Sequence, residues 1–354
     1  MFFKGKAFSP KQLDIELTYS CNLSCEMCPL HLFKLHNKVL EEKNRLKLND
    51  WENILVNFLR HGGKRLTVTG GEPLLYKDFA NVLKLGSKLG LKVTMLSNAT
   101  LINEENAKAI VSSGLKNLIT SIDGPSRIHD VIRGNGKLYK TISGLKILSK
   151  TKQQLNKSLP DLHASFTVTS TNQNHLYDFL EEIPDGLIKT VSVNRIFYTT
   201  NIRLRATKEI AGDNWIKKED WLLPKKLCEL DSDVLKNQIN EAKKLAEKKG
   251  ISIHISPVFN EKHICSQAKY DPPPFSRQCY YPWTSVRIDP IGNVYPCSIS
   301  LKLGNIKEKK LSDVWNDSPY LHFRRLLQKK NLFPMCSTCC VLTKPEWNIL
   351  PIKK

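Results

Sequence analysis

The chain has 354 residues, of which 41% are hydrophobic and 25% are charged, with 18 Pro and 17 Gly. This composition is that of an ordinary globular protein, and it excludes a disordered chain, a collagen-like repeat and a bare coiled coil. The length suits one large domain, or a large domain with an appendage, and either can bury a sizeable core. The chain is therefore long enough to form an enzyme.

The 54 Lys and Arg residues outnumber the 34 Asp and Glu residues, which gives a formal net charge of +20. Lys is scattered over the whole length, and such a surface favours acidic partners such as phosphorylated sugars, anionic lipid or an acidic electron-transfer protein. A solvated surface that serves no partner is the alternative. Nucleic acid is disfavoured as a partner, because the sequence offers no interleaved basic and aromatic surface for stacking.

No apolar run approaches the roughly 18 to 20 residues that a membrane-spanning helix needs, and the N-terminus lacks a signal peptide's apolar core. We therefore expect a cytoplasmic protein with no membrane span. Ten cysteines in such a protein indicate metal ligands or reactive thiols more than disulfides. Three of them lie near the start of the chain, two in the middle and five near the end.

Short apolar runs alternate with amphipathic stretches over the first 200 residues. The predicted strands are Leu13–Leu17, Leu66–Thr69, Val93–Ser97, Leu118–Ile122, Ala164–Thr169 and Val191–Phe197, and the predicted helices lie around 50–61, 78–89, 103–113, 137–149 and 174–182. This alternation predicts an α/β fold with a parallel sheet. The strands end in polar or Gly-rich tips, which favours a barrel with its site on the C-terminal rim over an open doubly wound sheet.

The later part of the chain has a different pattern. We expect residues 201–275 to form a connecting insert, which contains a helix over Ser232–Lys249 and ends at a run of three prolines, 272–274. Residues 276–354 are expected to form a small C-terminal domain, with a β-hairpin that turns at Gly292 and a helix over about 311–328. The first domain then covers residues 1–200.

Cys21, Cys25 and Cys28 follow the first predicted strand with the spacing C-x3-C-x2-C. Three thiolates can hold three corners of a [4Fe–4S] cluster and leave one iron open for another ligand. A structural zinc site is the alternative, but it needs a fourth protein ligand, and the nearest candidate is His31. The spacing therefore favours a cluster with an open iron.

Gly70, Gly71, Glu72 and Pro73 end the second predicted strand, and together with the three cysteines they resemble the radical S-adenosylmethionine (SAM) superfamily. The resemblance implies a partial (β/α)6 TIM-like barrel in which the amino and carboxylate groups of SAM chelate the open iron. The two glycines allow a close approach of backbone to a ligand, and Glu72 offers an acceptor for an ammonium group. Met27 stands where the family commonly has an aromatic residue, which weakens the expectation of ring packing on adenine.

The resemblance also implies that polar residues after the third and fourth strands bind the ribose of SAM: Ser97, Asn98, Ser121 and Asp123. Arg133 lies in a stretch similar to one found in family members with an extra cluster, and it is expected to pair with the SAM carboxylate. A surface ion pair with Asp130 is the alternative for this arginine. Asn194 or Arg195, at the tip of the sixth strand, is also expected to face the site.

The C-terminal cysteines have the spacing of a second, fully ligated cluster. The expected ligands are Cys279, Cys297, Cys336 and Cys339, with Cys340 as an alternative to Cys339. This pattern is similar to the SPASM/twitch extension of radical SAM enzymes in its shortened form, which holds one auxiliary [4Fe–4S] cluster. A four-cysteine zinc site is the alternative, because spacing alone does not separate zinc from iron–sulfur.

The resemblance implies an oxidoreductase that cleaves SAM reductively to a 5′-deoxyadenosyl radical, which abstracts hydrogen from an unactivated carbon. The auxiliary cluster is expected to accept the electron left on the substrate, giving net oxidation. Redox-neutral epimerisation is the alternative, with Cys228, Cys265 or Cys340 as the hydrogen donor. A non-catalytic iron–sulfur carrier is disfavoured, because the first motif lacks a fourth cysteine.

The basic surface favours a carbohydrate or phosphate-bearing small molecule as substrate, and a peptide is the second choice. The first motif begins at Cys21, which leaves no room before it for the leader-peptide domain that many peptide-modifying relatives carry. The expected reductant is a flavodoxin or a ferredoxin, since these acidic proteins are attracted to a basic surface.

Overall fold

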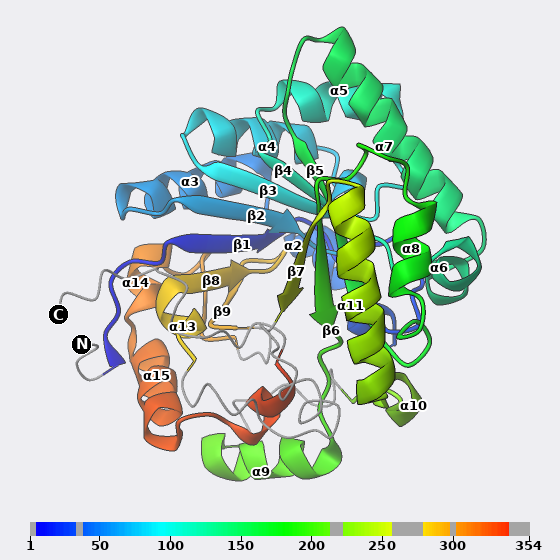
Figure 1. The fold of residues 1–354 in the computed structure, drawn as a ribbon. Helices are drawn as coiled ribbons and strands as arrows, with labels where there is room; N and C mark the ends of the chain where they lie inside the picture. The colour runs from blue at the N-terminus through cyan, green and yellow to red at the C-terminus, as the bar shows by residue number, and fades with distance from the viewer. Residues whose placement is uncertain (1–4, 33–37, 213–221, 257–278, 298–301, 340–354) are drawn as a thin grey trace, which may run out of the picture.

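The structure is a computed structural model that describes residues 5–32, 38–212, 222–256, 279–297 and 302–339. Its strands form one sheet in the order β10-β9-β8-β1-β2-β3-β4-β5-β6-β7 (Figure 1). The strands are β1 (Gln12–Glu16), β2 (Arg65–Thr69), β3 (Lys92–Ser97), β4 (Asn117–Ser121), β5 (Asp161–Val168), β6 (Thr190–Arg195), β7 (Ser252–Ser256), β8 (Ser285–Ile288), β9 (Asn293–Tyr295) and β10 (Gly304–Asn305). Strands β1 to β7 are parallel, so crossovers connect them.

Helices α3, α4, α5, α7, α8 and α11 form an outer layer around the parallel strands (Figure 1). The helices are α1 (Pro29–Leu32), α2 (Lys38–Asn44), α3 (Leu48–Arg60), α4 (Phe79–Lys88), α5 (Glu104–Ser112), α6 (Ser126–Arg133), α7 (Lys137–Gln154), α8 (Leu176–Glu182), α9 (Asn201–Ala211), α10 (Lys225–Cys228), α11 (Ser232–Lys248), α13 (Tyr281–Thr284), α14 (Leu311–Trp315) and α15 (Ser318–Lys330). Short 3-10 turns cover Pro73–Leu75 and Pro334–Thr338. Side chains cap several helices: Asp231, for example, accepts the N–H groups of Asp233 and Val234 at the start of α11.

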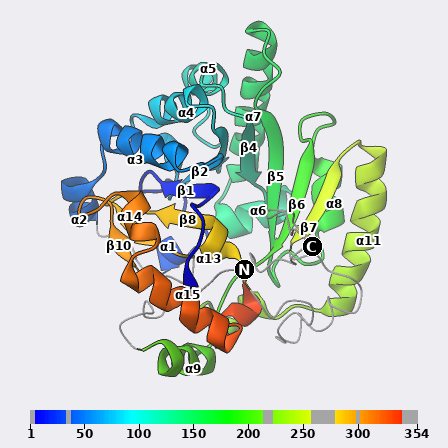
Figure 2. The same ribbon diagram turned by 90° about the vertical axis from the view of Figure 1, so that its left-hand side faces the viewer.

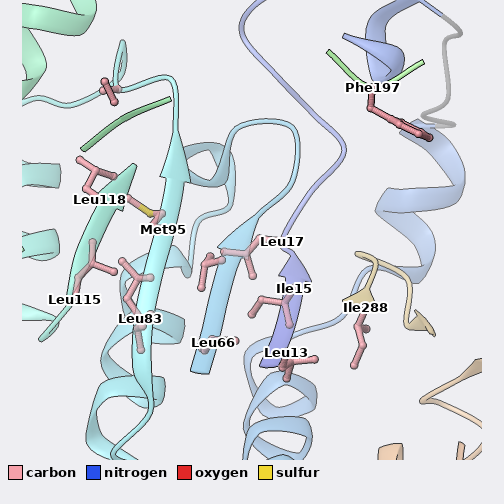
Figure 3. Packing of buried hydrophobic residues seen from close by; sticks show 14 of the residues in the cluster. Leu13, Ile15, Leu17, Leu66, Leu83, Met95, Leu115, Leu118, Phe197 and Ile288 are labelled. Atoms are coloured by element: carbon pink, nitrogen blue, oxygen red, sulfur yellow. The ribbon is translucent and has the colours of Figure 1, made fainter. Parts of the chain in front are cut away.

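The core lies between the sheet and this outer layer. On β1 to β4 the residues that face the helices are apolar and fully buried, as Leu13, Ile15, Leu66, Met95 and Leu118 illustrate (Figure 3). Burying one such side chain stabilises the fold by about 1.5–3 kcal/mol. The alternation of buried and half-exposed residues follows from the two-residue repeat of a strand.

The opposite face of the strands is polar, and we call it the inner face. On β4 to β6 its half-exposed side chains, toward the carboxyl ends, are Ser121, Ser165, Thr167, Ser192 and Asn194. The register pairs Ser121 with Ser165 and Thr167 with Asn194, so these side chains share one face. The amide of Asn194 donates to Ser165 Oγ at 2.9 Å. A sheet with this polar inner face provides a surface for a polar ligand.

The expected α/β fold with a mostly parallel sheet is confirmed, and the sheet is larger than six strands. Within the region expected to be a connecting insert, α11 and β7 continue the strand-helix alternation, and β7 lies parallel to β6. At the other edge β8 pairs with β1 in parallel, and β9 pairs with β8 in an antiparallel hairpin. The C-terminal hairpin therefore extends the sheet of the barrel.

The single helix expected over 311–328 is wrong, because the chain forms α14 and α15 there. The side chain of Asp317 accepts the N–H of Ser318 at 2.6 Å, and Pro319 occupies the first turn of α15. An acidic N-cap followed by proline starts a new helix. This break turns α15 toward the N-terminal segment (Figure 2).

A buried arginine joins α15 to its surroundings. Arg324 Nε donates to the carbonyl of Pro282 at 2.8 Å, and Nη1 donates to the carbonyl of Trp315 at 2.8 Å. Its guanidinium lies 4.1 Å from the centre of the Trp315 ring, a cation–π contact. These contacts hold α13, α14 and α15 together, and Nη1 also donates to the carbonyl of Gly5 in the N-terminal segment at 3.5 Å.

In the part of the chain that the structure describes, no helix is long and apolar enough to cross a membrane.

Candidate functional site

The three cysteines of the first motif lie on the loop that follows β1 (residues 18–28, the cysteine loop). Cys25 is buried, Cys28 is half-buried and Cys21 is exposed. The N–H of Cys28 donates to the carbonyl of Cys25 at 3.1 Å, which closes a tight turn. Burial raises the pKa of Cys25 to about 11; Arg133 lowers it, and the thiols of Cys28 and Cys21 raise it further. The three thiols therefore lie within electrostatic reach of one another.

The cysteine loop supplies three thiols, whereas a structural zinc site needs four protein ligands. Among the described residues, no three His, Cys, Asp or Glu side chains are close enough to share one metal ion. Zinc holds its ligand atoms at about 2.0–2.3 Å, whereas a cubane cluster binds each thiolate through a different iron. The cysteine loop thus fits a cluster better than zinc. Binding to iron would also relieve the burial cost, because a metal takes the thiolate form.

Gly70 and Gly71 bring the segment after β2 against the cysteine loop. A Cβ on Gly71 would lie 2.2 Å from the carbonyl oxygen of Ser20, and one on Gly70 would lie 2.4 Å from that of Thr18. The N–H of Gly71 donates to the Thr18 carbonyl at 2.7 Å. At these glycines two backbone segments thus approach each other closely, and the expectation that the glycines also admit a ligand stays a prediction.

Glu72 is fully buried and organises the carboxyl end of β3. Its carboxylate accepts hydrogen bonds from Ser97 Oγ at 2.7 Å, the N–H of Asn98 at 2.8 Å and the N–H of Leu74 at 3.1 Å. Burial raises the pKa of Glu72, and these hydrogen bonds oppose that rise. Pro73, also buried, starts the 3-10 turn beside it. Glu72, after β2, therefore contacts Ser97 and Asn98 at the end of β3, and all three are residues that the sequence predicts for the site.

Asn98 connects the end of β3 to the cysteine loop. Its Nδ2 donates to Asn22 Oδ1 at 2.9 Å, and its Oδ1 accepts from Thr100 Oγ1 at 2.6 Å. The Asn22 amide donates in turn to Thr100 Oγ1 at 2.8 Å, and Thr141 of α7 donates to the Asn98 carbonyl at 2.9 Å. This network fixes the middle of the cysteine loop.

Asp123, at the end of β4, forms a buried ion pair with Arg133 of α6. The distance from Arg133 Nε to Asp123 Oδ2 is 2.5 Å, and the side chains are 11% and 0% exposed. The other carboxylate oxygen accepts the N–H of Thr167 at 2.7 Å. Arg133 Nη1 also donates to Cys25 Sγ at 3.6 Å. A positive charge is thus held beside the cysteine loop.

Asp130, the alternative partner of Arg133, closes the turn after α6. Its carboxylate accepts the N–H of Gly136 at 2.7 Å and the N–H of Leu138 at 2.9 Å. Arg133 turns inward to Asp123 instead, because the fully buried carboxylate of Asp123 needs a cation more than the half-buried carboxylate of Asp130 does. This places Arg133 at the site that the sequence predicts for it.

His129 of α6 is a buried neutral ring beside Asp123. The backbone N–H of Asp123 donates to His129 Nδ1 at 3.2 Å, so this nitrogen acts as an acceptor. Burial lowers the pKa of His129 to about 4; the negative charge of Asp123 opposes this shift, and Arg133 adds to it. Protonating the ring would remove the acceptor and bring two cations together.

We expect this ring to make the fold less stable as the pH falls from 6.5 to 4. The unfolded chain protonates the ring near its ordinary pKa of 6.5, and the folded chain protonates it only near pH 4. Above pH 6.5 the ring is neutral in both states and contributes no pH dependence, and below it the free energy of unfolding falls by about 3 kcal/mol. Urea unfolding of wild type and His129→Asn across this range measures the effect. The variant retains an acceptor that does not titrate, so its decline should be shallower, and equal declines would contradict the assignment.

The C-terminal cysteines gather near the hairpin. Burial raises the pKa of Cys336, and the thiols of Cys279 and Cys297 raise it further. The N–H of Cys339 donates to the carbonyl of Cys336 at 3.1 Å, so Cys339 lies on the same turn. Three late thiols thus interact with one another, Cys339 follows them on the same turn, and Cys340 lies outside the described residues.

Cys228 is the one candidate hydrogen donor inside the described residues, since Cys265 and Cys340 lie outside them. Its thiol is buried and donates to the carbonyl of Pro224 at 3.7 Å. Burial raises its pKa to about 12, partly opposed by Arg195. It belongs to a small apolar cluster that also contains Met27 of the cysteine loop.

Two family models match the chain. The model of the radical SAM superfamily matches residues 15–159, which include the cysteine loop and Glu72, and the SPASM iron–sulfur cluster-binding domain matches residues 279–340. The chain belongs to the radical SAM superfamily. It is a radical SAM enzyme with a C-terminal SPASM domain, as the two cysteine motifs predict.

Relatives support this assignment along the whole chain. The AdoMet-dependent heme synthase of Methanosarcina barkeri is 22% identical and covers 94% of this chain and 88% of its own length. The sporulation killing factor maturation protein SkfB of Bacillus subtilis is 25% identical and covers 98% of this chain and 73% of its own length. The solved structure of Streptococcus suis SuiB with its precursor peptide SuiA shares the fold, with a TM-score of 0.64, 21% identity and coverage of 95% and 73%.

The family assigns SAM and a [4Fe–4S] cluster to the radical SAM domain, and further iron–sulfur binding to the SPASM domain. The residues fit these groups. Three thiols share the cysteine loop, and the thiols of Cys279, Cys297 and Cys336 lie within electrostatic reach of one another by the hairpin. The structure also supplies a buried cation, Arg133, beside the first set.

Several residues that build the site were missed from the sequence. Asn172, after β5, donates to the carbonyls of Asp123 and Thr167 at 3.0 and 2.9 Å and thereby holds two strand ends together. Its position after a predicted strand was an available signal, since polar tips of parallel strands meet at one rim. Asn22 gave no such signal, because its partners Asn98 and Thr100 are far away in the chain.

Proposed function

We propose that the chain is an oxidoreductase that modifies peptides. The proposed ligands are Cys21, Cys25 and Cys28 for the SAM-binding cluster, and Cys279, Cys297, Cys336 and Cys339 for one auxiliary cluster. When bound, these groups supply a 5′-deoxyadenosyl radical that takes hydrogen from carbon and an acceptor for the remaining electron. The chain's own residues bind and orient the substrate and exclude water from the radical.

The proposed SAM contacts are Gly70, Gly71, Glu72, Pro73, Ser97, Asn98, Ser121, Asp123 and Arg133. Most of them already have internal partners, so their main effect is to fix the shape of the site. Glu72 holds the ends of β2 and β3 together, and Arg133 is pinned by Asp123. Ser121 stands half-exposed on the inner face, where its hydroxyl can reach a ligand. Such preorganisation lets the site bind without first rearranging.

The observation that carries the peptide proposal is the chemistry of the inner face. Its side chains on β4 to β6, near the strand ends, are hydroxyls and amides without formal charge. Groups of this kind pair with the N–H and C=O groups of a peptide. A substrate with several carboxylates would need cations here, since a buried charge requires a partner. SuiB binds a precursor peptide on the same fold, and SkfB is a maturation protein.

A carbohydrate is the second candidate, because sugar hydroxyls suit the same serine, threonine and asparagine side chains. The net charge of +20 adds attraction for a phosphate-bearing sugar. The same charge supports an acidic flavodoxin or ferredoxin as the reductant. We also propose a cytoplasmic location, where a reducing environment keeps the ten cysteines as thiols.

The test supplies candidate substrates to the anaerobically reconstituted wild type with SAM and dithionite. A pool of synthetic peptides rich in uncharged residues should raise the release of 5′-deoxyadenosine, and one peptide should become lighter by the mass of two hydrogen atoms. Asn194→Leu should lower kcat/KM for that peptide about 2- to 12-fold, the effect of one net hydrogen bond. Asn117→Leu is the matched control, since Asn117 lies on the same face at the opposite end of β4. Stimulation by nucleotide sugars alone would overturn the peptide proposal in favour of the second candidate.

A further inference from the structure

A buried carboxylate connects the cysteine loop to the C-terminal hairpin. Asp289 follows β8 and is 2% exposed. Its Oδ2 accepts hydrogen bonds from Tyr19 Oη of the cysteine loop at 2.6 Å and from Tyr295 Oη of β9 at 2.9 Å. One oxygen thus joins segments that are about 270 residues apart in the chain.

The two tyrosines occupy matching places beside the two sets of cysteines. Tyr19 lies two residues before Cys21, and Tyr295 lies two residues before Cys297. The carboxylate of Asp289 is therefore the centre of a short path from one set of proposed cluster ligands to the other. Any change in its hydrogen bonds acts on both sets at once.

The hairpin by itself needs only one oxygen of this carboxylate. Oδ1 accepts the N–H of Ile291 at 3.1 Å and the N–H of Asn293 at 2.8 Å, which closes the turn between β8 and β9. Aspartate side chains commonly close turns in this way. Oδ2 also accepts from the Asn293 amide at 2.8 Å, but its contact with Tyr19 contributes nothing to the turn. That contact is explained by a need to hold the cysteine loop.

The cysteine loop is held firmly on its other side as well. Glu41 of α2 is buried, and its carboxylate accepts from Thr18 Oγ1 at 2.6 Å and from the N–H of Tyr19 at 3.2 Å. Arg45 pairs with the same carboxylate at 2.7 Å. The backbone at Tyr19 is therefore fixed, so its hydroxyl presents a defined point of attachment to Asp289.

A second bridge of the same kind lies nearby. Tyr281 of α13, two residues after Cys279, donates to the carboxylate of Asp14 on β1. Arg287 of β8 pairs with Glu16, also on β1. Burying these polar groups is costly unless they are paired, so the interface between β1 and the hairpin is specified by hydrogen bonds as well as by apolar packing.

We propose that Asp289 is a positioning residue that holds the cysteine loop and the hairpin in one fixed arrangement and so sets the separation of the two iron–sulfur clusters. The proposal rests on the proposed cluster ligands. A fixed separation matters because the substrate must lie between the radical source and the electron acceptor, and small displacements of reacting groups are costly.

The test compares Tyr19→Phe with a matched control, Tyr76→Phe, in the reconstituted full chain. Tyr76 is also buried and loses one hydrogen bond, to the Leu46 carbonyl at 3.1 Å, but it lies on neither proposed cluster segment. Three quantities are measured: iron and sulfide per chain, the magnetic interaction between the two reduced clusters by electron paramagnetic resonance, and amide hydrogen exchange in residues 17–28 and 286–297. Asp289→Asn is the second variant, since its amide oxygen still closes the turn while its NH2 group cannot accept from the tyrosines.

We expect Tyr19→Phe and Asp289→Asn to keep the iron content of wild type and to change the magnetic interaction. Hydrogen exchange in both segments should become about 2- to 12-fold faster, as expected for one lost hydrogen bond. Tyr76→Phe should leave the magnetic interaction and these segments unchanged. Two clusters with the same magnetic interaction in every variant would overturn the proposal alone. A wild type with a single cluster would overturn the proposed ligands, and this proposal with them.

Discussion

The triple variant Cys21→Ala, Cys25→Ala, Cys28→Ala is expected to lose all release of 5′-deoxyadenosine. Without these residues the cysteine loop lacks the three thiolates proposed to hold the cluster, and the nearby Asp123 carboxylate is already paired with Arg133. The iron content should fall from about eight to about four atoms per chain, since each [4Fe–4S] cluster holds four. Iron and sulfide analysis after anaerobic reconstitution, together with chromatography of the nucleoside, measures both effects.

The matched control for this triple variant is Cys228→Ala. This thiol is buried like Cys25 and hydrogen-bonds to the carbonyl of Pro224; it shares an apolar cluster with Met27 of the cysteine loop but is not a proposed cluster ligand. The control should retain the full iron content and the nucleoside release. If the triple variant retained its iron, or still cleaved SAM, the proposed ligands would be wrong. If wild type contained about four irons plus zinc, the radical chemistry would stand, but the auxiliary electron acceptor, and with it net oxidation, would be lost.

The parallel strands could be predicted because each is a short buried run with its own local signal. The run Leu66–Thr69 and the turn that follows it lie where the sequence places them. Strand β7 was missed, since a five-residue strand on an edge has half-exposed residues and resembles a connection. The pairing of β8 with β1 could not be predicted, because it joins segments about 270 residues apart and depends on how the whole sheet curls.

The sequence predicted which residues lie at the candidate site more successfully than it predicted which residues they contact. Glu72 lies at the site, but its partners are Ser97 and Asn98, which come from the next strand. Arg133 also lies at the site. It pairs with Asp123, and not with Asp130, which is nearer in the sequence and was the alternative partner. Sequence proximity favours pairs three or four residues apart, whereas burial in the fold decides which carboxylate most needs a cation. The role of Asp289 was missed for the same reason, because one of its two tyrosine partners, Tyr19, lies at the other end of the chain.

The Asp123–Arg133 pair gives the largest expected effect on stability. In Asp123→Ala the guanidinium of Arg133, 11% exposed, keeps its charge and loses its partner. Breaking a buried pair by removing one member costs about 3–5 kcal/mol. The substitution also leaves the N–H of Thr167 without its acceptor. The variant is therefore expected to be among the least stable single substitutions of this chain that keep its core intact.

Urea unfolding of Asp123→Ala and Asp178→Ala provides the matched measurement, because both substitutions remove the partner of an arginine on α6. Arg127 and Asp178 form an exposed pair with a distance of 3.0 Å, and their side chains are 70% and 37% exposed. Such a pair contributes only about 0–1 kcal/mol, since water already stabilises both charges. The buried pair should thus exceed the exposed one several-fold. Equal losses would contradict the assignment of Asp123 and Arg133 as a buried pair that holds a positive charge beside the cysteine loop.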